Sequence, residues 1–156
     1  MNPISITALI AAVLCNGLLA GTFFAFACSV VPGLRRVDDA TYVTTFRAIN
    51  RAILNGLFMS VFLGAPVLAV IVAVLRPEDT SSPWLIAGAV CSVATFVITA
   101  AVNVPLNRDL EAARSDTAAE LAAARLGFER RWNTAHLVRT LTSVGAAASL
   151  AIAIVV

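Results

Sequence analysis

Charge is scarce in this sequence, and lysine is absent from it. Only 13% of its 156 residues are charged, while 60% are hydrophobic. Since a water-soluble domain carries about 25% charged residues, this composition excludes a soluble domain and is typical of a membrane protein. The eleven basic residues are all arginines, and they mix with nine acids beside apolar runs. The sequence therefore lacks the free basic face that a nucleic-acid partner requires.

Metal-binding and redox motifs are also missing. The three cysteines, Cys15, Cys28 and Cys91, lie in apolar stretches without a CxxC pair, which indicates packing residues and disfavours a disulfide oxidoreductase. His136 is the only histidine, and the apolar runs contain no acid, so we expect no zinc or di-iron site. Haem ligation by two histidines requires a second chain. No phosphate-binding glycine loop, dinucleotide fingerprint or catalytic triad is present.

Four long apolar runs are present instead, each near the roughly 20 residues that cross a bilayer as a helix. We expect membrane spans at residues 6–31, 52–75, 84–106 and 134–156. The first run lacks the basic segment of a signal peptide and is interpreted as an uncleaved span. The fourth reaches a comfortable length only if His136 and Arg139 lie within its first turns. The runs predict an all-α fold, a membrane four-helix bundle that residues 1–156 form as a single domain.

The arginines predict the orientation of these spans. Ten of the eleven lie in or beside the connections between spans one and two and between spans three and four. By the positive-inside rule, these two connections face the cytoplasm. We therefore expect a multi-pass protein of the cytoplasmic (inner) membrane, with both termini outside.

Both arginine-rich connections carry helical patterns. From Asp39, a predicted N-cap, apolar residues recur at helical spacing, and this helix can continue directly into the second span. Thr117 and Glu120 have the spacing of a capping box at the start of another helix. Pro32 and Pro105 are expected to end spans one and three, because proline interrupts helical hydrogen bonding.

Small residues recur at four-residue spacing on two spans, as Gly17 and Gly21 on the first and as Gly145 and Ser149 on the fourth. Such stripes allow helices to approach closely in lipid. They predict close packing either within the bundle or between the subunits of a homo-oligomer.

Polar side chains converge at the expected cytoplasmic ends of spans two, three and four. Asn55, Asn103 and Arg139 each lie about one turn, or roughly 5 Å, inside their spans. Ionisable groups are costly in a membrane and face the bundle or a wet cavity, so we predict a polar pocket open to the cytoplasm under an apolar roof. The candidate residues are Asn50, Arg51, Asn55, Asn103, Asn107, Trp132, Asn133, His136 and Arg139.

These candidates combine a base that titrates near neutral pH, a guanidinium and several amides. Such a set can take a proton from an acidic carbon and stabilise the resulting enolate or phenolate. Each residue also has a structural interpretation: arginines reach lipid headgroups, asparagines join helices by hydrogen bonds, and a single histidine is structural. The hypothesis of a site depends on convergence from three helices.

Several segments are similar to one known family. They are residues 21–26 (Gly-Thr-Phe-Phe-Ala-Phe), 31–34, 49–55, 103–107 (Asn-Val-Pro-Leu-Asn) and 131–140. In this order, and over nearly the whole chain, the sequence resembles the anthrone oxygenase-like family of small four-helix membrane proteins. The resemblance implies oxidation by O2 of the central methylene of an anthrone to give an anthraquinone, as in aromatic polyketide pathways.

The resemblance also implies roles for the candidate residues. His136 is expected to take the methylene proton. Arg139, with Asn103 or Asn107, is expected to stabilise the oxyanion, and Trp132 to stack on the flat rings. The other candidates are expected to bind substrate: Asn133, Asn55, Arg51 and Asn50. Oxygen then reacts with the anion without a metal or flavin cofactor, and the expected partners are membrane lipid and an aromatic small molecule.

Two other classes of function remain open. The chain can be a non-catalytic membrane subunit or small-molecule binding module, whose polar cluster holds the helices in register. A transporter is disfavoured, because no ionisable residue lies near the middle of a span. A cavity beside His136, Arg139, Asn103 and Asn55 favours the enzyme, whereas mutual saturation of these side chains favours a structural role.

Overall fold

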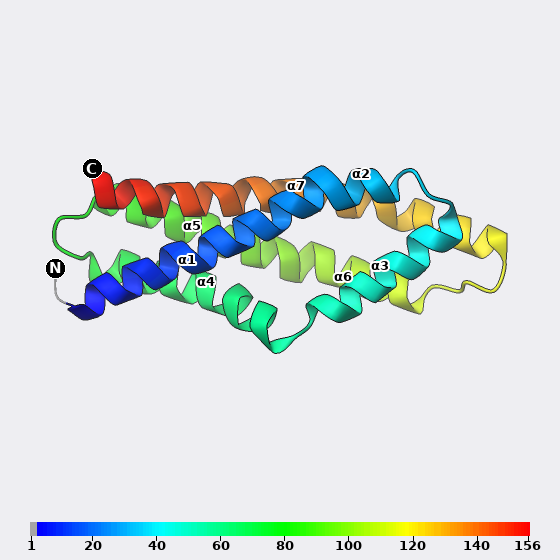
Figure 1. The fold of residues 1–156 in the computed structure, drawn as a ribbon, viewed down its shortest axis with the longest axis horizontal. Helices are drawn as coiled ribbons and strands as arrows, with labels where there is room; N and C mark the ends of the chain where they lie inside the picture. Colours follow the sequence, from blue (N-terminus) through cyan, green and yellow to red (C-terminus); the bar gives the residue numbers. More distant parts are fainter. Residues whose placement is uncertain (1–2) are drawn as a thin grey trace.

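Four helical rods lie side by side in the computed structural model, which describes residues 3–156 (Figure 1). Rod one consists of α1 (Pro3–Ala25), the π-helix η1 (Phe26–Val30) and α2 (Val31–Leu34), and rod two of α3 (Asp39–Ile53) and α4 (Gly56–Leu75). Rod three consists of α5 (Ser82–Ile98), the π-helix η2 (Thr99–Asn103) and α6 (Val104–Ala112), and rod four of α7 (Ala118–Val155). Residues 3–156 form no strand, and the predicted all-α class is confirmed.

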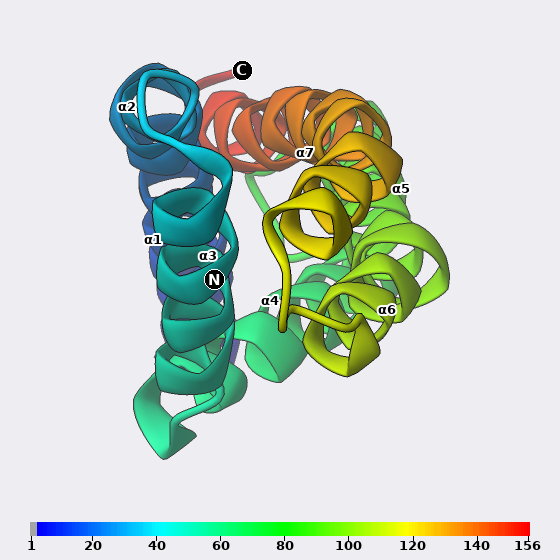
Figure 2. The ribbon, with the colours of Figure 1, turned by 90° about the vertical axis from the view of Figure 1, so that its right-hand side faces the viewer.

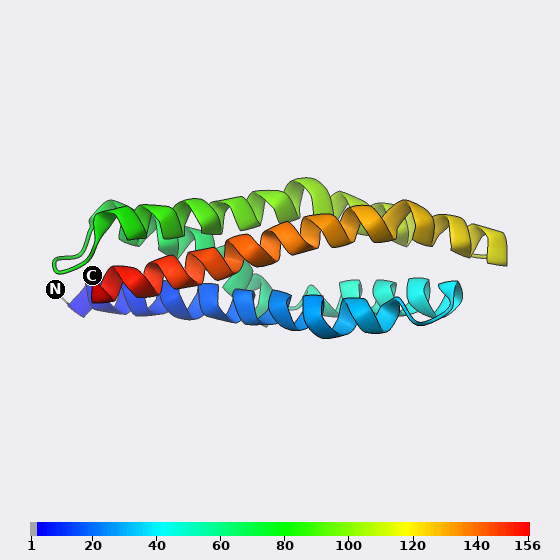
Figure 3. The same cartoon turned by 90° about the horizontal axis from the view of Figure 1, so that it is seen from above.

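Each rod packs against two neighbours, so that the rods close into a ring (Figure 2). Helices α1 and α5 both lie against α4 and α7. The start of α1 and the C-terminus lie together at one end, and the connections 35–38 and 113–117 lie at the other, as Figures 1 and 3 show. We call this second end the charged end, because Arg35, Arg36 and Arg114 lie in its connections. The predicted four-helix bundle is confirmed.

The rods are long and apolar. Four helical segments have the length and composition needed to cross a membrane: Pro3–Leu34, Gly56–Leu75, Ser82–Ala112 and Ala118–Val155. They indicate a membrane protein. Helix α7 has 38 residues, which at about 1.5 Å per residue extend about 57 Å, whereas the hydrocarbon core of a bilayer is about 30 Å thick. The charged end of the bundle therefore reaches beyond the apolar layer.

Pro105 does not end its rod, and that prediction is wrong, whereas rod one ends at Leu34, directly after Pro32 and Gly33, as predicted. Each proline follows a five-residue π-helix, η1 or η2, and the rod continues to Leu34 or Ala112. In an α-helix, a proline ring collides with the carbonyl group four residues earlier. The wider π turn moves that carbonyl away, so rods one and three pass through their prolines.

Rod two, by contrast, breaks between Ile53 and Gly56, and α3 does not continue into α4. Asn55 makes this break. Its Oδ1 accepts a hydrogen bond from the backbone N–H of Phe58 at 3.0 Å, and its Nδ2 donates to the carbonyl of Ala52 at 2.9 Å. One side chain thus caps the start of α4 and the end of α3. Figure 1 shows rod two bending away from the bundle at this point.

Side chains also cap the two helices that start at the charged end. Asp38, rather than the predicted Asp39, is the N-cap of α3, and it accepts hydrogen bonds from the backbone N–H and the hydroxyl of Thr41, both at 2.9 Å. These bonds lower the pKa of the Asp38 carboxyl, since they favour its charged form. The predicted capping box of Thr117 and Glu120 at the start of α7 is confirmed.

The two small-residue stripes lie in different surroundings. Gly145 faces α5, where an added Cβ would lie 3.5 Å from Sγ of Cys91, and Ser149 is buried. Gly17 and Gly21 lie on the outer surface of α1, where an added Cβ would meet no atom within 4 Å. The stripe on α7 therefore serves packing within the bundle, and a homo-oligomer through the stripe on α1 stays a prediction.

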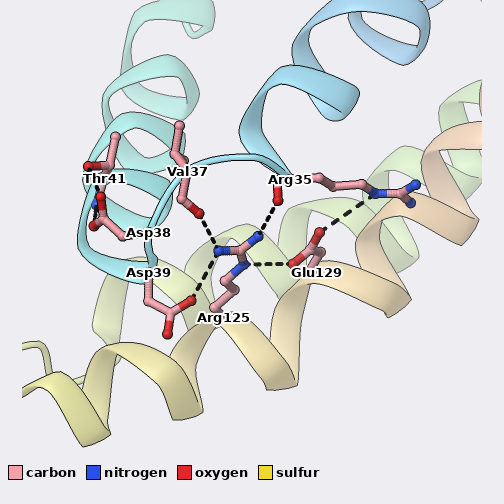
Figure 4. A network of polar contacts seen from close by, with 7 residues as sticks. All are labelled: Arg35, Val37, Asp38, Asp39, Thr41, Arg125 and Glu129. Carbon is pink, nitrogen blue, oxygen red and sulfur yellow. Dashed lines mark hydrogen bonds and ion pairs between the residues drawn. The ribbon is translucent and has the colours of Figure 1, made fainter.

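A network around Arg125 holds the connection between rods one and two against α7 (Figure 4). The guanidinium donates to the backbone carbonyl of Val37 at 2.8 Å. It also pairs with Asp39 at 3.0 Å and with Glu129 at 2.7 Å. Its Cζ lies over the ring of Tyr42, 4.4 Å from the centroid. Burial raises the pKa of the Tyr42 phenol, so this ring is uncharged and offers its π face to the cation.

Replacing Arg125 with Met is expected to lower the free energy of unfolding by roughly 2–4 kcal/mol. The hydrogen bonds between charged groups are lost, and the acceptors that Arg125 bonded are left without a donor. Thermal unfolding of the purified protein measures the loss. Arg114→Met is the matched control, since Arg114 is 80% exposed in its pair with Glu120 and exposed ion pairs contribute little. Equal losses in the two variants would show that the network does not stabilise the charged end.

Candidate functional site

A cavity of about 180 Å³ lies inside the bundle, beside the break in rod two. Every rod contributes a buried side chain to its lining. Trp132 and Arg139 of rod four form the floor, and Phe23, Phe62 and Thr99 of the other rods belong to the walls. Aromatic rings therefore surround one guanidinium in the interior of an apolar bundle.

Arg139 places a cation on this floor without a carboxylate partner. The residue is 8% exposed, and its Nε donates a hydrogen bond to Nδ1 of His136 at 3.0 Å. Its Cζ lies 4.4 Å from the ring centroid of Phe23 and 5.0 Å from that of Trp132. The ion pairs between described residues do not include Arg139. Since a buried charge is costly unless it is paired, this guanidinium favours an anion in the cavity.

His136 lies behind Arg139 and does not line the cavity. Its ring stacks on Trp132 at a centroid distance of 4.8 Å and is nearly perpendicular to the rings of Phe23 and Phe26. Because Nδ1 accepts the hydrogen bond from Arg139, the neutral ring carries its proton on Nε2. Nε2 is buried without a hydrogen-bond partner, although the backbone carbonyl of Phe23 lies near the ring. In this arrangement His136 holds Arg139 in place, and the lone pair of Nδ1 is used in the hydrogen bond to Arg139.

Trp132 connects the floor to two asparagines of rod three. Its Nε1 donates to Oδ1 of Asn107 at 2.7 Å, and its backbone carbonyl accepts a hydrogen bond from Nδ2 of Asn103 at 3.4 Å. An indole N–H can only donate, so Oδ1 of Asn107 is engaged and its NH2 group is left for a ligand. Asn107 lines the cavity, whereas Asn103 lies behind it with Oδ1 buried and without a partner.

Of four other predicted site residues, one lines the cavity and three lie elsewhere in the structure. Asn50 lines the cavity, and its Nδ2 is buried without a hydrogen-bond partner. Arg51 is exposed and pairs with Glu111 at 2.8 Å. Asn133 lines a separate groove of about 360 Å³ on the outside of α7, and Asn55 caps the two helices at the break in rod two. The structure therefore does not bring Arg51, Asn133 or Asn55 to the cavity.

The aromatic walls of the cavity were missing from the sequence prediction. Phe23, Phe26 and Phe62 resemble ordinary apolar residues of membrane spans, and periodicity does not distinguish a wall of a cavity from a packed core. The one signal for two of them is the segment 21–26, which carries part of the family resemblance. A further wall residue, Thr99, donates its hydroxyl to the carbonyl of Thr95 at 2.8 Å.

The cavity offers hydrogen-bond donors beside aromatic faces. The Nη groups of Arg139 and the NH2 groups of Asn107 and Asn50 make no hydrogen bond to another described residue. Such a set fits a flat ring system with oxygen acceptors along one edge. Within residues 3–156, no three His, Cys, Asp or Glu side chains are grouped so that they could hold a metal ion. The cavity of about 180 Å³ is smaller than the about 300–1,000 Å³ of most small-molecule sites, so a large ligand requires wall side chains to move.

A comparison with protein families identifies the relatives of this chain. The sequence model of the family described as anthrone oxygenase matches residues 55–149, more than half of the chain. The chain belongs to the anthrone oxygenase family. No match was found among curated proteins or among solved structures. The anthrone oxygenase match contains the rod-three and rod-four side of the cavity, including Asn107, Trp132 and Arg139, whereas Phe23 and Asn50 lie outside it.

Replacing Trp132 with Phe is expected to destabilise this anthrone oxygenase family member by roughly 1–3 kcal/mol, because the half-buried Oδ1 of Asn107 loses its donor. Thermal or denaturant unfolding measures the change. Trp84→Phe is the matched control, since Trp84 is 40% exposed. If the two variants unfold alike, the bond between Trp132 and Asn107 does not stabilise the site.

Proposed function

We propose that the chain is a membrane-bound oxygenase that oxidises a planar phenolic, anthrone-like substrate with O2 in the cavity beside Arg139. The observation that carries this proposal is a buried guanidinium without a carboxylate, which faces an aromatic-walled cavity in a member of the anthrone oxygenase family. The positively charged floor supports chemistry that passes through an anion, and the flat walls support a planar ring system.

Arg139 is the residue that we assign to the oxyanion. An ionised phenol or enolate oxygen at its Nη groups would receive charge-assisted hydrogen bonds, which are about twice as strong as neutral ones. The NH2 groups of Asn107 and Asn50 lie on the same cavity and can donate to further oxygens of the substrate. Trp132 contributes its ring to the floor, where a flat substrate can stack. Asn103, in our proposal, acts through Trp132 and Asn107 rather than on the substrate.

The proposed reaction converts a methylene group into a carbonyl group. The methylene loses one proton, and the resulting carbon anion is delocalised onto the ring oxygen that Arg139 stabilises. The anion gives two electrons to O2 and forms a C–O bond, which produces a peroxide. Loss of the second C–H proton breaks the O–O bond, so one oxygen stays as the carbonyl and the other leaves as water. This sequence balances without a metal or flavin, and we propose O2 as the only co-substrate.

His136 has two roles open to it in this scheme. As the predicted base, it must accept the methylene proton on Nδ1, and Arg139 must first leave that atom for the substrate oxygen. As a positioning residue, it keeps Nδ1 bonded to Nε of Arg139 and so aims the Nη groups at the cavity. The contact at 3.0 Å supports the second role directly, and the assignment as base stays a prediction.

The proposal includes an orientation in the cell. We place the protein in the cytoplasmic membrane, with the charged end in the cytoplasm and both termini outside, because the arginines concentrate at that end. A polyketide-derived anthrone made in the cytoplasm would reach the membrane from that side. A fusion of a cytoplasm-active reporter to the C-terminus is expected to be silent.

Membranes that contain the protein are expected to take up O2 above the spontaneous background when a hydroxylated anthrone is added. Arg139→Gln should lower kcat by about 100-fold or more, the loss that follows removal of a donor to a developing oxyanion. Arg51→Gln is the matched control, since Arg51 is exposed and paired with Glu111. Binding of a hydroxyanthraquinone without O2 uptake would identify a binding module instead, and uptake that survives in Arg139→Gln would remove Arg139 from the reaction.

Two substitutions separate the roles of His136. His136→Asn retains an acceptor near the place of Nδ1 but removes the base, whereas His136→Leu removes both. A positioning role predicts that the Asn variant retains most of the activity and the Leu variant loses it. A role as base predicts that both variants lose the reaction. Steady-state O2 uptake, at matched protein abundance, distinguishes the two.

A further inference from the structure

The rim of the cavity lies between rods one and two. Among the side chains that line the cavity, Thr22 on α1 and Leu54 at the end of α3 are the exposed ones, and Leu54 is 69% exposed. Trp132 and Arg139, at 2% and 8% exposure, form the opposite floor. The cavity therefore opens sideways from the bundle.

The break in rod two produces this opening. Helix α4 packs along α1, whereas α3 packs against α6 and α7. The two halves of rod two thus follow different partners, and rod two bends outward at residues 54–55 (Figure 1). Asn55 fixes the bend through its bonds to both helices, so the opening is part of the folded backbone.

The surroundings of the rim are apolar. Leu57 and Leu18, next to the two rim residues, are 79% and 59% exposed. The hydroxyl of Thr22 donates to the carbonyl of Leu18 at 2.8 Å, so the rim presents little free polarity. Arg51 lies one helical turn from Leu54 on the side of the charged end. Arg51 thus lies on the headgroup side of the rim, and the exposed leucines surround the rim. In a bilayer, this order places the rim just below the headgroups, where the apolar belt begins.

We propose that the cavity takes its ligand sideways from the bilayer, through the rim at Thr22 and Leu54. The ligand class is an uncharged, lipid-dissolved planar phenol that ionises only when it reaches Arg139. The identity of this ligand rests on the proposed function. The position of the rim in lipid is independent of it. It replaces access from the cytoplasm, which the charged end alone suggests, with access through the apolar face.

Fluorescence quenching places the rim directly. In a Trp84→Phe background, a Leu54→Trp variant in vesicles of brominated phosphatidylcholine should be quenched as strongly as a Leu57→Trp variant. Iodide in the buffer should quench a Leu126→Trp variant, whose position on α7 near the charged end is 84% exposed, and should leave Leu54→Trp bright. The signal of Trp132 is subtracted with the parent Trp84→Phe protein. Quenching of Leu54→Trp by iodide rather than by bromine would overturn the lateral opening.

Turnover tests whether the rim admits the substrate. With a hydroxylated anthrone, Leu54→Trp should raise KM several-fold through obstruction of the rim while kcat changes little, because the floor is intact. Leu57→Trp carries the same added bulk outside the cavity and should keep the wild-type KM. An unchanged KM in Leu54→Trp would overturn the proposal. If the wild-type protein takes up no O2, the proposed function fails, and the quenching experiment still decides whether the cavity opens into lipid.

Discussion

The structure depends on how a guanidinium is kept inside an apolar bundle. Arginine stays protonated in proteins, so Arg139 cannot avoid the cost of burial, which amounts to several kcal/mol for an unpaired ion. The fold offsets this cost with one acceptor, Nδ1 of His136 at 3.0 Å, and with the π faces of Phe23 and Trp132. A carboxylate would neutralise the site completely. These neutral partners reduce the cost while leaving the floor of the cavity positive.

Two kinds of backbone irregularity make room around this cation. The π-helices η1 and η2 occur at matching places before Pro32 and Pro105, and each widens a rod at the level of the site. The widened turn of rod one contributes Phe26 to the wall, and that of rod three contributes Thr99. The break at Asn55 then turns α3 away from α1. Proline and asparagine chemistry, rather than a gap in side-chain packing, thus determines where the bundle opens.

Much of the fold follows from the sequence, and less of the site does. Four long apolar runs, with arginine concentrated in two of the three connections, leave few alternatives to a four-helix bundle, and the capping box at Thr117 is a local pattern. Whether Pro105 ends a helix depends on the turn before it, which local patterns do not determine. Polar residues in apolar runs pointed to Arg139, but the partners of each amide depend on tertiary structure. Asn55 was predicted to bind substrate and caps two helices instead.

In the proposed reaction, the cavity would bind the charged intermediate more strongly than the uncharged molecules before and after it. A neutral phenol or quinone carbonyl at Arg139 accepts an ordinary hydrogen bond, whereas an oxyanion accepts a charge-assisted one that is about twice as strong. Interactions that strengthen only as charge develops raise kcat, and those that hold substrate and product equally do not. The absence of a carboxylate from the floor therefore suits the proposed reaction.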